Sequence, residues 1–142
     1  MSPFEFVLQV VSAFFGVIAV AITVQVPKKN LLLAGLTGAC GWMVELVMEN
    51  SIFSAFLASL LVAVLSQIFA RVSKTPVTVY LITGIFPLVP GVGMYRTVYY
   101  LLQSDRELTS YYLTYTLQIA GMIALAIFVV DSFFKKLYQK RS

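Results

Sequence analysis

The stretch that decides the fold is residues 84–96, which read Gly-Ile-Phe-Pro-Leu-Val-Pro-Gly-Val-Gly-Met-Tyr-Arg. It lies inside an apolar run that extends from residue 77 to about residue 102. Each proline removes a backbone hydrogen-bond donor and clashes with the preceding turn, at a cost of about 3 kcal/mol inside a helix. The glycines add backbone freedom. The pattern predicts two half-helices, separated at the Pro-x-x-Pro-Gly motif of residues 87–91.

The composition of the whole chain indicates that this broken segment lies in a membrane. Of the 142 residues, 60% are hydrophobic and 11% are charged, whereas soluble domains carry about 25% charged residues. A soluble fold could not hide so much apolar surface from water. One cysteine and no histidine exclude an intrachain disulfide and an imidazole metal site. We expect an all-α integral membrane bundle rather than a soluble enzyme or a secreted disulfide scaffold.

Five apolar runs are long enough to cross a hydrocarbon core about 30 Å thick. Short polar or basic loops separate them, and we expect a single transmembrane domain over residues 1–142. The alternative is that the fourth segment enters and leaves on one side, but the basic C-terminal tail would then lie outside, against the positive-inside rule. The predicted spans are residues 4–26, 31–48, 52–70, 77–102 and 109–130, followed by a basic tail at 135–142.

The distribution of charge predicts an orientation in the cell membrane. Most of the basic residues fall in three regions that are cytoplasmic if the N-terminus is outside, which also places the C-terminus inside. This explains the basic balance without a nucleic-acid partner. The first apolar run is long and its lysines follow it, unlike those of a cleaved signal peptide, so we expect it to be a span. The residues in these three regions are Lys28, Lys29, Arg71, Lys74, Lys135, Lys136, Lys140 and Arg141.

Small residues line one face of two predicted helices. Gly38 and Gly41 lie on one stripe with Glu45. Because small residues let a neighbouring helix approach closely, this face should contact protein, and helix packing is the simplest interpretation. Glu45 is also a candidate for proton coupling; the alternatives are an ion pair or a position at the outer interface. The first stripe begins at Ala34, and the second runs through Ala55, Ser59, Ala63, Ser66 and Ala70.

The break supplies the candidate binding site. Irregular backbone inside a membrane persists only within protein or beside a wet cavity. The second half-helix should begin near Val92 and near mid-membrane, where its positive dipole end suits a carboxylate. Arg96, about one turn further on, could clamp that carboxylate; the alternative is a structural kink, with Arg96 reaching outward or paired to Glu45. The candidate substrate-binding residues are Pro87, Pro90, Gly91, Gly93, Tyr95 and Arg96.

Several motifs resemble those of the threonine/serine exporter (ThrE) family. They are residues 56–62, Ala70-Arg71 with Lys74-x-Pro76, and Pro87-Leu-Val-Pro90-Gly91-x-x-x-Tyr95. The likeness covers roughly residues 5–135 and is to the second half of the family's fold, which also exists as a YjjB-type small subunit. It implies export of small hydrophilic metabolites, which are threonine and serine for fused members and succinate for split ones. It also implies a YjjP-like larger subunit as the partner.

We therefore expect the small subunit of a two-component exporter of a small carboxylate, either succinate or threonine/serine, in a homo- or hetero-oligomer within the lipid bilayer. A rival hypothesis is a scaffold that assembles or stabilises the transporting partner and touches no substrate, which the small-residue stripes motivate. The sequence contains no nucleophile–base pair, metal-ligand cluster or phosphate loop, so we expect neither enzyme activity nor a cofactor.

Overall fold

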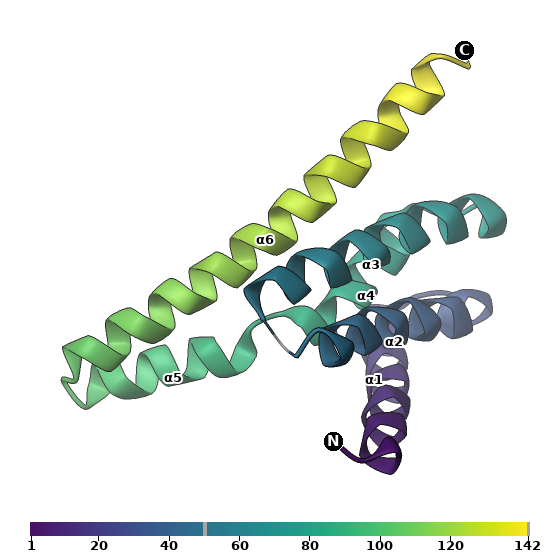
Figure 1. Cartoon of the computed structure of the whole chain (residues 1–142). Coiled ribbons are helices and arrows are strands. Elements are labelled where there is room, and N and C mark those ends of the chain that lie inside the picture. The colour runs from purple at the N-terminus through teal and green to yellow at the C-terminus, as the bar shows by residue number, and fades with distance from the viewer. Residues whose placement is uncertain (50, 142) are drawn as a thin grey trace.

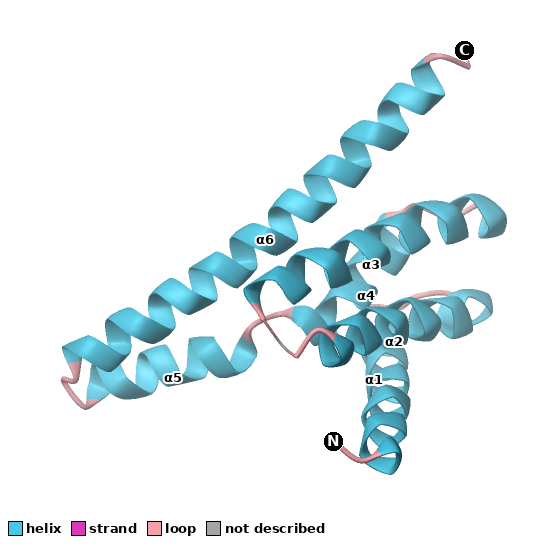
Figure 2. Ribbon diagram, in the orientation of Figure 1, coloured by secondary structure: helices cyan, strands magenta, loops and turns pink. Residues whose placement is uncertain are grey.

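The computed structural model describes residues 1–49 and 51–141, and in these ranges the chain is helical with no strand (Figure 2). The all-α prediction is thus confirmed. Four helices are long and apolar enough to cross a membrane, and a pair of helices bent by 52° would be a fifth if the two together form one span. The four are α1 (Pro3–Thr23), α2 (Leu31–Val47) together with the preceding 3-10 turn η1 (Lys28–Asn30), α3 (Ile52–Ser73) and α6 (Arg106–Gln139). The bent pair is α4 (Thr78–Ile85) with the 3-10 turn η2 (Phe86–Leu88), followed by α5 (Gly91–Leu102).

The helices form a bundle with a projecting arm. α2 packs against α1, α3 and α4, whereas α5 packs chiefly against α6. Figure 1 shows α5 and the first half of α6 as a hairpin that extends away from α1 to α4. α6 returns along α3, where Ile119 and Ile123 join a buried cluster with Ala55. The bend between α4 and α5 therefore lies where the bundle meets the arm.

The small-residue stripes are used for helix packing. Gly38 of α2 lies directly against Val17 of α1. A Cβ atom on Gly41 would lie 2.5 Å from Cγ2 of Val62 in α3, far inside normal contact. Ala55 of the second stripe contributes to the cluster between α3 and α6. Close approach between helices accounts for both stripes.

The turns between helices use residues other than glycine for their left-handed backbone conformations. Four residues other than glycine have left-handed backbones, with φ between 56° and 61°, and in the described residues no glycine has a positive φ. One of them, Gln25, explains why α1 ends at Thr23, short of the predicted limit at residue 26. The helix α6 instead extends past the predicted span at both ends, because Asp105 caps its start and neither proline nor glycine follows Gly121. The four residues are Gln25, Glu49, Lys74 and Ser104.

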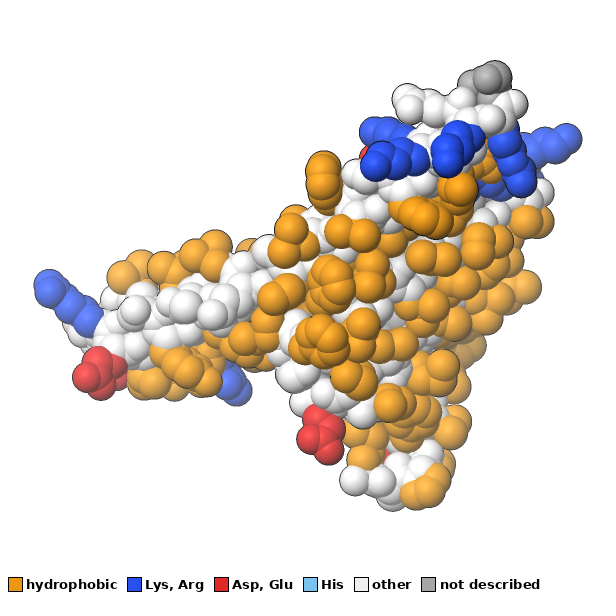
Figure 3. Space-filling model, turned by 45° about the horizontal axis from the view of Figure 1, so that its top comes forward, with side chains coloured by type: hydrophobic (Ala, Val, Ile, Leu, Met, Phe, Trp, Pro, Cys, Tyr) orange, Lys and Arg blue, Asp and Glu red, His pale blue; other side chains and the backbone are white. Residues whose placement is uncertain are grey.

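One end of the molecule gathers most of the basic side chains (Figure 3). α1 and α3 end there and α2 and α4 begin there, because one residue from each joins a single buried cluster. α6 ends there too, since the guanidinium carbon of Arg71 in α3 lies 4.1 Å from the ring centroid of Tyr138. The three basic regions of the sequence are therefore close in space. The cluster consists of Ala21, Ala34, Ala70 and Tyr80.

Candidate functional site

The interruption between α4 and α5 has a defined backbone geometry. Pro87 is the second residue of η2, which follows α4 directly, and it has no amide proton with which to continue the helical hydrogen bonds. Pro90 has φ −77° and ψ 62°, and the Gly91 amide donates to the Val89 carbonyl at 2.7 Å. These values describe an inverse γ-turn centred on Pro90. The chain leaves this turn directly into α5, which begins at Gly91.

The first turn of α5 presents unpaired amides. The Met94 amide donates to the Pro90 carbonyl at 3.0 Å. The amides of Val92 and Gly93 have no hydrogen-bond acceptor among the described residues. Such amides, together with the positive end of the helix dipole, form the usual anion-binding arrangement at a helix start. The Gly91 amide is taken by the γ-turn, so ligand binding through the backbone would use the next two amides.

The two glycines of the motif have different surroundings. A Cβ atom on Gly93 would overlap the hydroxyl of Thr116 in α6, so this glycine permits the close approach of α5 and α6. A Cβ atom on Gly91 would meet nothing within 4 Å. Gly91 therefore faces open space at the bend, whereas Gly93 is a packing residue.

Arg96 and Tyr95 lie on the hairpin. Arg96 Nη1 donates to the hydroxyl of Tyr112 in α6 at 3.1 Å, and the guanidinium carbon lies 5.3 Å from the Tyr112 ring centroid. The Tyr112 ring in turn stacks on Tyr100, with centroids 5.6 Å apart. Tyr95 is 68% exposed. The described residues place no acidic side chain within ion-pair distance of Arg96, so the predicted alternative of a pair with Glu45 is not seen.

Glu45 lies apart from the bend, at the contact between α2 and α3. Its side chain lies near Ser54 of α3, whose hydroxyl donates to the Ser51 carbonyl at 2.6 Å. Its Oε2 atom is buried and has no hydrogen-bond partner among the described residues. The side chain is half-buried and is not part of an ion pair in the described chain. Glu45 and Arg96 are therefore not joined in one cluster.

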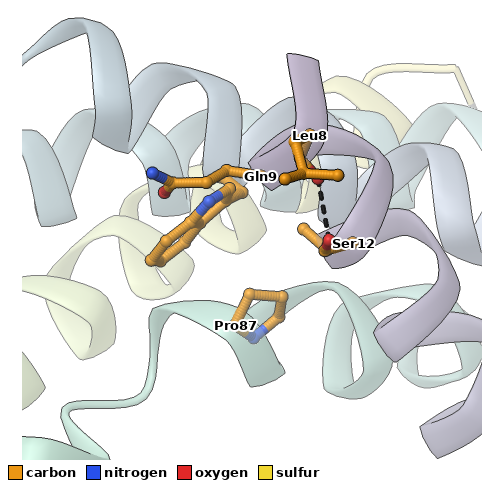
Figure 4. Close-up of a pocket in the computed structure, with 6 residues that line it drawn as sticks. Leu8, Gln9, Ser12 and Pro87 are labelled. Carbon is orange, nitrogen blue, oxygen red and sulfur yellow. Dashed lines mark hydrogen bonds between the residues drawn. The ribbon is translucent and has the colours of Figure 1, made fainter. Parts of the chain in front are cut away.

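A pocket of about 440 Å³ lies between α1, α2 and η2 (Figure 4). Gln9 and Ser12 of α1 face it, with Pro87 on the opposite side. The Ser12 hydroxyl donates to the Leu8 carbonyl at 2.7 Å. Of the predicted site residues, Pro87 alone lines this pocket, which also includes Leu8, Ala13 and Trp42.

The polar residues of this pocket were not predicted from the sequence. A signal was present, because Gln9 and Ser12 are three residues apart and follow Glu5 by four and seven residues. Residues at these spacings share one face of a helix. The described residues contain no group of three acidic, cysteine or histidine side chains that could hold a metal ion.

The helical bundle, its apolar helices and the bent helix pair define a multi-pass membrane protein. Its sequence matches the family model described as "Threonine/Serine exporter, ThrE" over residues 9–133. The chain belongs to this family of transporters, which confirms the resemblance drawn from the motifs. No curated protein and no solved structure matches the chain.

Proposed function

We propose that this chain is the small subunit of a two-component exporter of small carboxylates, either succinate or threonine/serine, and acts with a YjjP-like larger subunit. The observation that carries the proposal is the interruption at Pro90, which leaves the Val92 and Gly93 amides without acceptors. An uninterrupted apolar helix pairs its interior amides internally and has nothing to offer an anion. The carboxylate group is common to all the candidate substrates.

The length of α6 indicates how deep the bend lies within the membrane. With 34 residues it is about 51 Å long, well beyond a hydrocarbon core of about 30 Å. If Asp131, just before the basic end, marks the cytoplasmic surface, the opposite surface lies about 20 residues earlier, near Tyr112. Thr116, which contacts Gly93, is then about 6 Å below that surface. We therefore place the bend in the outer half of the membrane rather than near its middle, with the N-terminus outside.

This placement gives the site residues separate roles. The first amides of α5 bind the substrate carboxylate, and Arg96, at the level of Tyr112, attracts it at the outer surface. Gln9 and Ser12 line the adjoining pocket beside Pro87 and supply hydrogen bonds to hydroxyl or ammonium groups. Glu45, away from the bend, is the candidate for proton coupling.

Transport by vesicles that contain this chain and the co-expressed larger subunit tests the proposal. We expect Arg96→Ala to lower the flux of labelled succinate or threonine by about tenfold or more, because a hydrogen bond to a charged group contributes about 1.5–3 kcal/mol. Arg106→Ala, the same change at the start of α6, is the matched control and should leave the flux unchanged. Normal transport by Arg96→Ala at equal membrane abundance would remove Arg96 from the mechanism.

The projecting hairpin favours a second candidate function, that of a scaffold for the transporting partner. α5 packs chiefly on α6 and leaves most of its own surface uncovered. A tight complex in a pull-down, together with transport that is insensitive to every substitution at residues 87–96, would support the scaffold and contradict the exporter site.

A further inference from the structure

We infer that the basic end of α3 and α6 binds the headgroup of an anionic phospholipid. The site, which we term the Arg71 cleft, consists of a hollow lined by Phe134, Leu137, Tyr138 and Arg141 of α6. Arg71 of α3 contacts two of its rings, Phe134 and Tyr138. It is separate from the bend at Pro90 and does not depend on the proposed transport function.

Arg71 is held in one orientation by aromatic rings. Its guanidinium carbon lies 4.1 Å from the Tyr138 ring centroid and 4.8 Å from that of Phe134. Its Nη1 atom donates to the Gln67 carbonyl at 2.9 Å. A guanidinium has five N–H donors in a fixed plane, and the described residues provide one acceptor for it, the Gln67 carbonyl, so most donors stay available. This arrangement suits the bidentate recognition of a phosphate.

Two hollows along the end of α6, one of them lined by the two rings that Arg71 contacts, combine apolar walls with cationic rims. One of about 220 Å³ is lined by Phe134, Leu137, Tyr138 and Arg141. The neighbouring one, of about 410 Å³, shares Leu137 and is lined by Phe133, Lys136, Gln139 and Lys140. Phe133 and Leu137 are exposed. The glycerol and ester groups of a phospholipid can cover such apolar walls while its phosphate reaches the rim, whereas a free phosphate leaves the walls uncovered.

The charge at this end is not neutralised within the described chain. The ion pair there joins Lys135 to Asp131 at 2.9 Å between exposed side chains. No acidic side chain of the described residues lies within ion-pair distance of Arg71 or Arg141. Clusters of basic residues beside membrane-crossing helices attract anionic lipids, with about 1 kcal/mol for each residue near the surface. An anionic phospholipid thus matches the available donors of Arg71, the apolar walls of the hollows and the unpaired positive charge.

Lipid titrations of the full chain in a mild detergent, followed by native mass spectrometry, test this inference. We expect phosphatidylglycerol to bind more tightly than phosphatidylcholine. Arg71→Gln and Arg141→Gln should each weaken phosphatidylglycerol binding about fivefold and leave phosphatidylcholine unaffected. Arg141 makes no stacking contact with the rings that hold Arg71, so Arg141→Gln tests the site even if Arg71→Gln fails to fold.

Arg106→Gln, which removes the same charge from the other end of α6, is the matched control. Equal binding of the two lipids, or equal weakening by Arg106→Gln, would overturn the inference. Inorganic phosphate should not compete at millimolar concentration, and its full displacement of the lipid would show an adventitious anion site instead.

Discussion

Replacing Pro87 and Pro90 together by alanine should reduce transport below about a tenth of the normal rate while the protein stays folded. Alanine supplies the missing amide protons and removes the clash of each ring, which costs about 3 kcal/mol inside a helix. The Val92 and Gly93 amides, which lack acceptors now, could then bond to the preceding turn of one continuous helix. The site for the carboxylate would be lost without removal of any polar side chain.

Transport assays and a distance measurement should be made on the same variant. Nitroxide labels on the exposed residues Ile82 and Leu101, in a background with Cys40 replaced by alanine, report whether the 52° bend has opened. Pro76→Ala, the same substitution in the loop before α4, is the control and should change neither quantity. A straightened helix pair that transports normally would show that the interruption is dispensable.

Gly84→Val should cause a large loss of stability, because Gly84 of α4 is enclosed by side chains from two other helices. A Cβ atom there would lie 2.8 Å from Cγ2 of Thr37 and 2.8 Å from Cγ1 of Val62. Both neighbours are β-branched and have few alternative rotamers, so they cannot move aside easily. We expect the free energy of unfolding to fall by about 1–3 kcal/mol, seen as a lower melting temperature in detergent.

The matched variant for this measurement is Gly121→Val in α6, where an added Cβ atom would meet nothing within 4 Å. Its melting temperature should stay close to that of the unmodified protein. Equal loss of stability in the two variants would assign the effect of Gly84→Val to helix propensity rather than to crowding between α2, α3 and α4.

Helix positions could be predicted from the sequence because apolar runs and breakers are local signals. The double-proline motif indicated an interruption, and the structure places the inverse γ-turn at its second proline. The end of α1 was less predictable. Glycine or asparagine usually marks a left-handed helix end, but here the left-handed residue is Gln25. Gly93 indicated that another helix approaches α5 closely. The sequence did not identify the contacting residue, Thr116, because it lies 23 positions further along the chain.

The composition of the candidate site was harder to predict because it depends on how helices pack. Arg96 finds its partner in Tyr112, and nothing in the sequence near Arg96 specifies that register. The pocket beside Pro87 is completed by Gln9 and Ser12 from the first helix. The face of Glu45, in contrast, could be predicted, because the small residues before it pack against other helices and its Oε2 atom is buried.

Glycine in this chain permits close contact between helices, and the described glycines do not form its left-handed turns. Five of its eight glycines lie where a methyl group would collide with a neighbouring helix, while left-handed turns fall to glutamine, glutamate, lysine and serine. A left-handed backbone costs such residues about 1–2 kcal/mol each. In the described residues, left-handed backbone strain is thus confined to these four turns between helices. Substitutions that favour a left-handed backbone at these four turns should therefore stabilise the protein without changing any contact between helices.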